Sequence, residues 1–178
     1  MITNITLTTK ERYLLEDAKT HEEECILKYN NYANLACDNQ LKAVFRSNGQ
    51  QEQKHLQTIN ELLSGKVPSM SGGQSGGQSG SQNNAQGGGQ QSQPMPQSQQ
   101  SSIEQASNGS SPFKASDKDL CTDMLMTEKY VSGAYNISIF EFKDAQVRDV
   151  LNHIQTEEQK HGEAIFAYMQ SKGMYTAK

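Results

Sequence analysis

The chain has 178 residues, of which 34% are hydrophobic, so it can form one ordinary domain with a modest core. Its net charge of -4 provides no basic surface for a phosphate backbone, and we therefore expect no nucleic-acid partner. The apolar runs are too short to cross a bilayer, which argues against membrane insertion. The N-terminus has neither a basic start nor an apolar stretch, so we expect no signal peptide and synthesis in the cytoplasm.

The first helical pattern begins at Thr8-Thr9-Lys10-Glu11, which matches a capping box. No glycine or proline interrupts the chain from there to Gly49, and Asp38 is a typical cap for a second helix. Because apolar side chains recur at alternating steps of three and four, we predict a helical hairpin over residues 7–66. The predicted inward positions are Leu15, Ala18, Glu22, Cys25, Tyr29, Tyr32 and Ala36, then Leu41, Phe45, Asn48, Glu52, His55, Ile59 and Leu62.

Residues 67–115 differ sharply in composition from the rest of the chain. Residues 71–111 hold 9 of the 14 glycines and 11 glutamines, with Glu104 as their only charge. Such a segment buries too little apolar surface to offset its ordering entropy, so we predict a disordered Gly/Gln/Ser-rich linker. A coil of roughly 45 residues spans about 37 Å, close to the length of a helix of about 25 residues. The linker can therefore return along the bundle and leave the helices on either side of it parallel.

A second helical hairpin is predicted over residues 116–173. Ser116-Asp117-Lys118-Asp119 has the pattern of a helix start, and Asp144 is the expected cap of the last helix. The apolar spacing again alternates between three and four residues. The predicted inward positions are Cys121, Met124, Glu128, Val131, Tyr135, Ser138 and Phe142, then Val147, Leu151, Ile154, Glu158, His161, Ile165 and Tyr168.

The two predicted hairpins are copies of one another. Both contain the tetrapeptide Glu-Gln-Lys-His, at residues 52–55 and 158–161, an offset of 106 residues. The same offset pairs Glu22 with Glu128 without a gap. The chain is therefore a duplication, and each half supplies one lone glutamate and one Glu-x-x-His.

This set of residues is typical of a di-metal carboxylate centre in a ferritin-like bundle. On a helix, side chains three positions apart share a face, so the glutamate and histidine of each motif point the same way. Four carboxylates in a core repel one another unless cations or protons neutralise them. We therefore predict a site for two divalent metal ions, iron or manganese. The predicted ligands are Glu22, Glu52, His55, Glu128, Glu158 and His161.

Other chemically active side chains receive structural interpretations. Tyr29 and Tyr135 lie two turns after the lone glutamates, where they could donate hydrogen bonds or carry a radical, but core packing is the commoner role. His21 and His153 have no counterpart in the other half and are expected at the surface. The cysteines are odd in number and lack metal-ligand spacing, so we expect free thiols. They are Cys25, Cys37 and Cys121.

Several stretches of the chain resemble the Coat F family of spore-coat proteins. They are Leu7-Thr8-Thr9-Lys10-Glu11-Arg12, Lys28-Tyr29-Asn30-Asn31-Tyr32-Ala33, Gln51-Glu52-Gln53-Lys54-His55 and Tyr135-Asn136-Ile137-Ser138-Ile139-Phe140-Glu141. The resemblance covers both hairpins and omits the linker. It implies a ferritin-like four-helix fold and a place in the coat of a bacterial spore, assembled from the mother-cell cytoplasm with other coat proteins as partners.

Two functions fit these observations. The first is a structural coat component that could form a homo-oligomer, in which metal holds the helices together and the glutamine-rich linker serves as a tether or a glutamine donor for cross-linking. The second is a di-iron or di-manganese oxidoreductase of the peroxidase, ferroxidase or catalase type. Storage of iron in a closed cage is disfavoured, because the long insert would burden the outer surface of a shell. We favour the structural function and leave open whether the chain is an enzyme.

Overall fold

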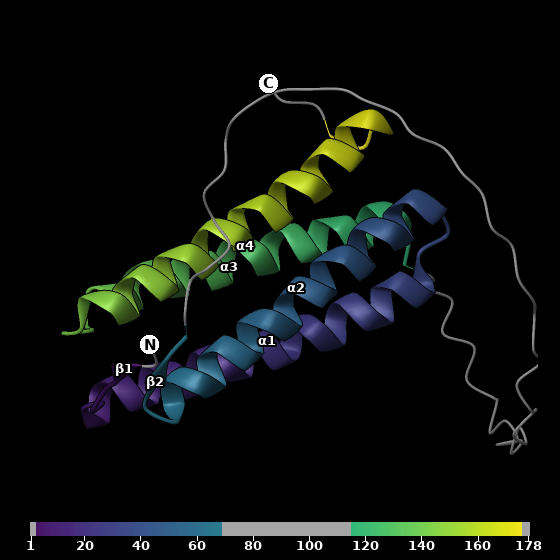
Figure 1. The fold of residues 1–178 in the computed structure, drawn as a ribbon. Coiled ribbons are helices and arrows are strands. Elements are labelled where there is room, and N and C mark those ends of the chain that lie inside the picture. The colour runs from purple at the N-terminus through teal and green to yellow at the C-terminus, as the bar shows by residue number, and fades with distance from the viewer. Residues whose placement is uncertain (1–2, 69–114, 176–178) are drawn as a thin grey trace, which may run out of the picture. The chain divides into compact units, whose positions relative to one another are not determined.

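The computed structural model describes residues 3–68 and 115–175. Its four helices are α1 (Thr9–Leu35), α2 (Asn39–Leu63), α3 (Asp117–Ile139) and α4 (Ala145–Ser171) (Figure 1). The predicted all-α bundle of two helical hairpins is confirmed. The predicted linker falls almost wholly on residues 69–114, outside the described part of the chain. None of the described helices has both the length and the apolar character needed to span a bilayer.

The helices begin where the sequence predicts. The four expected caps are confirmed, since each accepts a hydrogen bond from a backbone amide in the first turn of its helix; they are Thr8, Asp38, Ser116 and Asp144. Helix α2 ends at Leu63, and Gly65 follows with a φ of 80°, a left-handed conformation that glycine adopts without strain.

A short pair of strands was not predicted. β1 (Thr3–Asn4) pairs antiparallel with β2 (Lys66–Val67), and the amide of Ile5 donates to the carbonyl of Gly65 at 2.9 Å. Two residues are too few to show an alternating pattern, so the sequence carries no signal for these strands. The pairing holds the N-terminal segment against the end of α2.

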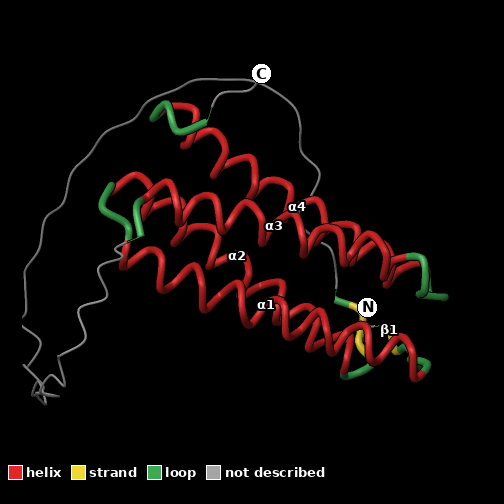
Figure 2. The backbone as a smooth tube through the Cα atoms, turned by 180° about the vertical axis from the view of Figure 1, so that it is seen from behind, coloured by secondary structure: helices red, strands yellow, loops and turns green. Residues whose placement is uncertain are grey.

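The two hairpins pack side by side, with α1 against α3 and α2 against α4 (Figure 2). The starts of α2 and α3 lie at the same end of the bundle, because the amide of Asp38 donates to Asp117 Oδ2 at 2.9 Å. The end of α4 reaches the same place, where Lys172 Nζ lies 2.7 Å from Asp38 Oδ2. Helices α2 and α3 therefore run in the same direction, as the predicted crossover requires.

The inward faces of α2 and α4 are confirmed at every predicted position, while α1 and α3 depart from the prediction near their ends. Tyr32 and Ser138 are only half-buried, and Ala33 and Ile139 are buried in addition. The steps of three and four used for the prediction average 3.5 residues per turn, whereas a straight helix has 3.6. The inward face therefore drifts by about one residue over seven turns.

The buried apolar residues form two clusters, one toward each end of the bundle. Along α2, Leu41 and Phe45 belong to one cluster, and Ile59 and Leu62 belong to the other. The Glu-x-x-His of α2 lies between these pairs in the sequence, and the same order holds along α4. A buried polar layer is thus enclosed above and below by apolar packing.

Each hairpin also caps the turn of the other. Glu11 Oε1 on α1 accepts from the amide of Lys143 at 2.9 Å, and Asp117 Oδ1 on α3 accepts from the amide of Cys37 at 2.7 Å. Glu11 and Asp117 are related by the 106-residue offset, and so are Cys37 and Lys143. The duplication therefore preserves the contacts between hairpins as well as the hairpins themselves.

We expect Glu11→Ala to lower the free energy of unfolding by about 2 kcal/mol, because it removes a buried carboxylate that accepts from the amides of Thr8 and Lys143. Urea unfolding followed by circular dichroism measures the change. Glu16→Ala, at an exposed position on the same helix, is the matched control and is expected to change stability little. Equal effects of the two substitutions would contradict the cross-hairpin role of Glu11.

Candidate metal centre

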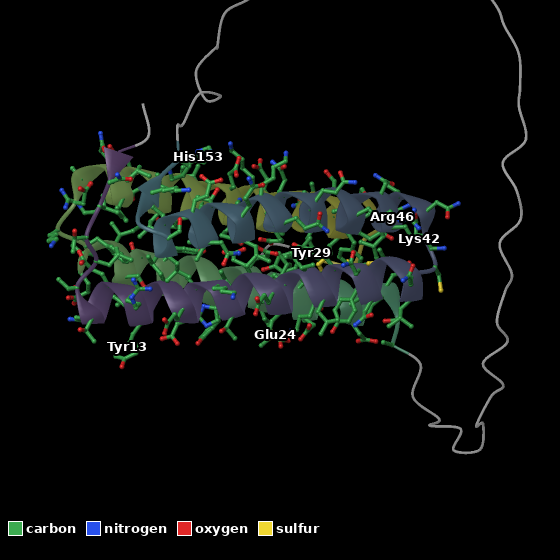
Figure 3. The ribbon with its side chains drawn as sticks, turned by 60° about the horizontal axis from the view of Figure 1, so that its bottom comes forward. Tyr13, Glu24, Tyr29, Lys42, Arg46 and His153 are labelled. Atoms are coloured by element: carbon green, nitrogen blue, oxygen red, sulfur yellow. The ribbon has the colours of Figure 1, made fainter. Side chains whose placement is uncertain are left out.

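The six predicted ligand residues meet in one buried layer. Helix α1 supplies Glu22, α3 supplies Glu128, and α2 and α4 each supply the glutamate and histidine of one Glu-x-x-His. None of the six is more than 4% exposed. Neighbouring Glu24 is exposed and points outward, whereas Tyr29 lies among the helices (Figure 3). Of the three consecutive glutamates Glu22, Glu23 and Glu24, Glu22 alone is buried, as its predicted inward position requires.

These side chains form two overlapping groups of four. In each group, one ligand atom from every residue lies within 4.8 Å of the others. Glu52 and Glu158 belong to both groups. Glu22 and His55 complete the first group, and Glu128 and His161 complete the second. The arrangement suits two ions with two shared carboxylates.

The imidazoles face these carboxylates through their Nδ1 atoms. His55 Nδ1 lies 3.0 Å from Glu52 Oε2 and 3.0 Å from Glu158 Oε1. His161 Nδ1 lies 3.0 Å from Glu52 Oε1. The two rings stack with their centroids 5.6 Å apart. Each Nδ1 is therefore directed at the shared glutamates.

Several carboxylate oxygens in the layer accept no well-aligned hydrogen bond, although imidazole nitrogens lie as near as 3.0 Å. They are Glu22 Oε2, Glu128 Oε2 and both oxygens of Glu158. Buried carboxylate oxygens without donors are costly and rare, so each needs an explanation. Directed at one another and at two imidazoles, these oxygens have the donor chemistry of a divalent metal site. The residues present therefore fit two metal ions.

In the absence of metal ions, the four glutamates of the layer differ in charge. Burial raises the pKa of Glu22 and of Glu128 to about 8, so both lone glutamates hold protons at neutral pH. Burial also opposes ionisation of Glu158, but the His161 and His55 imidazoles beside it lower its pKa to about 2. The shared glutamates are thus the charged pair.

The pKa values of both histidines are raised, although burial alone would lower them. Burial disfavours the imidazolium, yet the contacts with Glu128, Glu158 and Glu52 raise the pKa of His161 to about 11. For His55, Glu157 and the buried carboxylates likewise raise the pKa far above its ordinary value. In the metal-free protein, both imidazoles act as the cations of the layer.

Two tyrosines link the hairpins through the lone glutamates. The Tyr29 hydroxyl on α1 donates to Glu128 Oε1 on α3, and the Tyr135 hydroxyl on α3 donates to Glu22 Oε1 on α1. Each lone glutamate therefore keeps its Oε2 directed into the centre, 3.6 Å from the Nδ1 of its own hairpin's histidine. The predicted core position of both tyrosines is confirmed, and the contact with the glutamates adds a polar role.

Glu157 is a site residue that the sequence analysis missed. His55 Nε2 lies 2.8 Å from Glu157 Oε2, so the ring has a carboxylate on each side. Glu157 is only about a fifth exposed, one position before Glu158 on α4. The residue at the corresponding position of α2 is Gln51. This difference between otherwise matching repeats is the signal that could have identified Glu157.

The remaining candidates lie outside the layer. His153 is exposed, with Nε2 3.5 Å from Glu157, and His21 is half-buried with its ring against Tyr130. The three cysteines form no disulfide. These positions agree with the surface and free-thiol interpretations.

Comparison with known proteins gives one match. Residues 116–178 match the Coat F domain, a range that covers α3 and α4. No curated protein and no solved structure matches the chain.

Proposed function

We propose that the chain is a spore-coat protein whose bundle is stabilised by two divalent metal ions; the match of its second hairpin to the Coat F domain supports the place in the coat. Glu22 and His55 would hold one ion, and Glu128 and His161 would hold the other. Glu52 and Glu158 would bridge the two. Iron and manganese suit this mixture of carboxylates and imidazoles.

The observation that carries the proposal is the set of buried carboxylate oxygens without hydrogen bonds. Four carboxylates carry four negative charges, and two divalent ions with neutral imidazoles balance them. Metal binding would also replace the protons of Glu22 and Glu128 with a partner that both Oε2 atoms can contact. Metal bound by a folded centre adds its binding free energy to the stability of the fold.

The surrounding side chains would set the orientation of the ligands. With metal on Nδ1 of His55, the Nε2–H donates to Glu157, which fixes the tautomer and the ring plane. Tyr29 and Tyr135 hold the lone glutamates so that one oxygen of each remains directed inward. Because each tyrosine reaches across to the other hairpin, metal binding at either half would tighten the contact between hairpins.

Titration of the metal-free protein with Mn²⁺, followed by isothermal calorimetry, tests this proposal. We expect saturation at about two ions per chain, as the paired ligand groups require. Glu22→Gln/Glu128→Gln removes one carboxylate charge from each group and is expected to weaken both binding events. Absence of binding to the wild-type chain would contradict the metal lock.

An oxidoreductase with the same two-metal centre is the second candidate function. It is favoured by a cavity whose lining includes Glu128 and Glu158. Catalytic metal sites keep an open position, whereas structural sites are closed. Consumption of hydrogen peroxide or oxidation of ferrous iron by the metal-loaded chain would support this function, and inactivity in both assays would leave the structural lock alone.

A further inference from the structure

A cavity of about 520 Å³ opens between α3 and α4. Its walls are mainly apolar, with Leu125, Met126, Phe166 and Met169 among the lining residues. Glu128 and Glu158 also line it, and they are 2% and 0% exposed, whereas Met126 at the rim is 67% exposed. The cavity therefore opens at the surface, and two residues of the metal centre form part of its lining.

The two copies of the hairpin differ at the residues that line this cavity. Gly162 lies in the lining, and the corresponding residue of the first hairpin is Leu56. A Cβ atom at Gly162 would lie 3.9 Å from Leu125 Cδ2, so a full leucine side chain there would extend into the open space. The positions of Leu125 and Phe166 correspond to Lys19 and Asn60, which cannot form an apolar wall.

The surface beside Leu56 is hollowed in a different way. A pocket there is lined by Leu56 and by polar side chains of α2 and the residues just after it, among them Gln53 and Gln57. None of the six centre residues belongs to its lining. The two halves of the centre are thus unequal. The half that contains Glu128 and His161 borders the cavity between its own helices, whereas the pocket beside Leu56 has no centre residue in its lining.

We propose that the cavity between α3 and α4 binds a small uncharged apolar molecule, with one end of that molecule against Glu128 and Glu158. Its volume is in the range of small-molecule sites, and most of its lining area is apolar, with Lys129 as the one cationic side chain among the described residues that line it. The inference deepens the oxidoreductase candidate by naming a substrate class. Any reaction of the bound molecule depends on the proposed metal centre, whereas binding of the molecule does not.

Toluene is the probe, and full-length protein with ¹³C-methyl-labelled methionines is the reporter. In the metal-free chain, we expect saturable shifts of the Met126 and Met169 methyl signals and intermolecular nuclear Overhauser effects from toluene to Met169. Met124, which belongs to the apolar packing outside the cavity lining, is expected to show neither. Absence of contact between toluene and Met169 in the wild-type chain would overturn the proposal without any variant.

Gly162→Leu installs the residue that the first hairpin carries and is expected to abolish the toluene shifts. Gly133→Leu, on α3 where an added Cβ meets no atom within 4 Å, is the matched control and is expected to retain them. Persistence of the shifts in Gly162→Leu would overturn the assignment of the cavity. Mn²⁺ is then titrated into the same metal-free samples, so that loss of the cavity and loss of the centre are distinguished.

Discussion

The double substitution Glu52→Ala/Glu158→Ala is expected to abolish the stabilisation of the bundle by divalent metal. Both residues belong to both ligand groups, so their removal leaves each group with one glutamate and one histidine. Free metal at a thousand times its dissociation constant stabilises a folded protein by about 4 kcal/mol, and the variant should lose this increment. Thermal unfolding with Mn²⁺ and with chelator measures it.

The metal-free forms provide the other half of this test. In the metal-free protein the two shared carboxylates face the His55 and His161 imidazolium groups, so their removal leaves buried cations without partners, and the metal-free variant is expected to be less stable than the metal-free wild type. Glu23→Ala/Glu24→Ala, at exposed positions of α1, makes the same change in net charge and is expected to keep the metal response. Equal metal stabilisation of the two double variants would contradict the assignment of the shared ligands.

The metal-free protein is expected to lose stability as the pH rises from 5 to 8. Because the pKa of Glu22 and of Glu128 is raised to about 8 in the folded state, both carboxyls hold protons that the unfolded chain releases near pH 4.5. The raised pKa of His161 acts in the same direction from pH 6.5 upward. Each extra proton held by the folded state lowers the free energy of unfolding by about 1.4 kcal/mol per pH unit.

The sign reverses below this window. Since the pKa of Glu158 is lowered to about 2, its contribution is present above pH 4.5 and is lost as the pH falls toward 2. Urea unfolding at pH 5, 6.5 and 8 in the presence of chelator measures the slope, and Glu22→Gln/Glu128→Gln should flatten it between pH 5 and 6.5. Stability of the metal-free wild type that increases from pH 5 to 8 would contradict the protonated state of the lone glutamates.

The same protons link metal binding to pH. Two divalent ions displace the protons of Glu22 and Glu128 and require neutral imidazoles, so binding releases protons and its affinity increases with pH. Calorimetry of Mn²⁺ binding in two buffers with different ionisation enthalpies counts the protons released. A count near zero at pH 7 would show that the glutamates are already ionised.

The sequence predicted the layer of six residues because the duplication gave two independent copies of one pattern. Helical spacing fixes which side chains share a face, and Glu52 and His55 therefore had to point the same way. The caps at Asp38 and Asp144 then set the heights of the helices, which brought the two copies to the same level. The direction of the crossover followed from the length of the linker.

Contacts that depend on the position of one hairpin relative to the other could not be predicted from the sequence. An inward position predicted that Tyr29 is buried but not that its hydroxyl reaches Glu128 on a different helix. Glu157 lies one residue from an inward position, and its contact with His55 depends on the spacing of α2 and α4. The cavity likewise depends on the absence of one side chain, at Gly162, which no periodic pattern marks.

The most direct test of the metal-locked coat protein is elemental mass spectrometry of the full-length chain, purified without chelator. We predict about two equivalents of iron or manganese per chain, and their loss in Glu52→Ala/Glu158→Ala. Wild-type protein that carries no divalent metal, and whose stability does not change when Mn²⁺ is added, would contradict the proposed centre and leave a bundle held by packing alone.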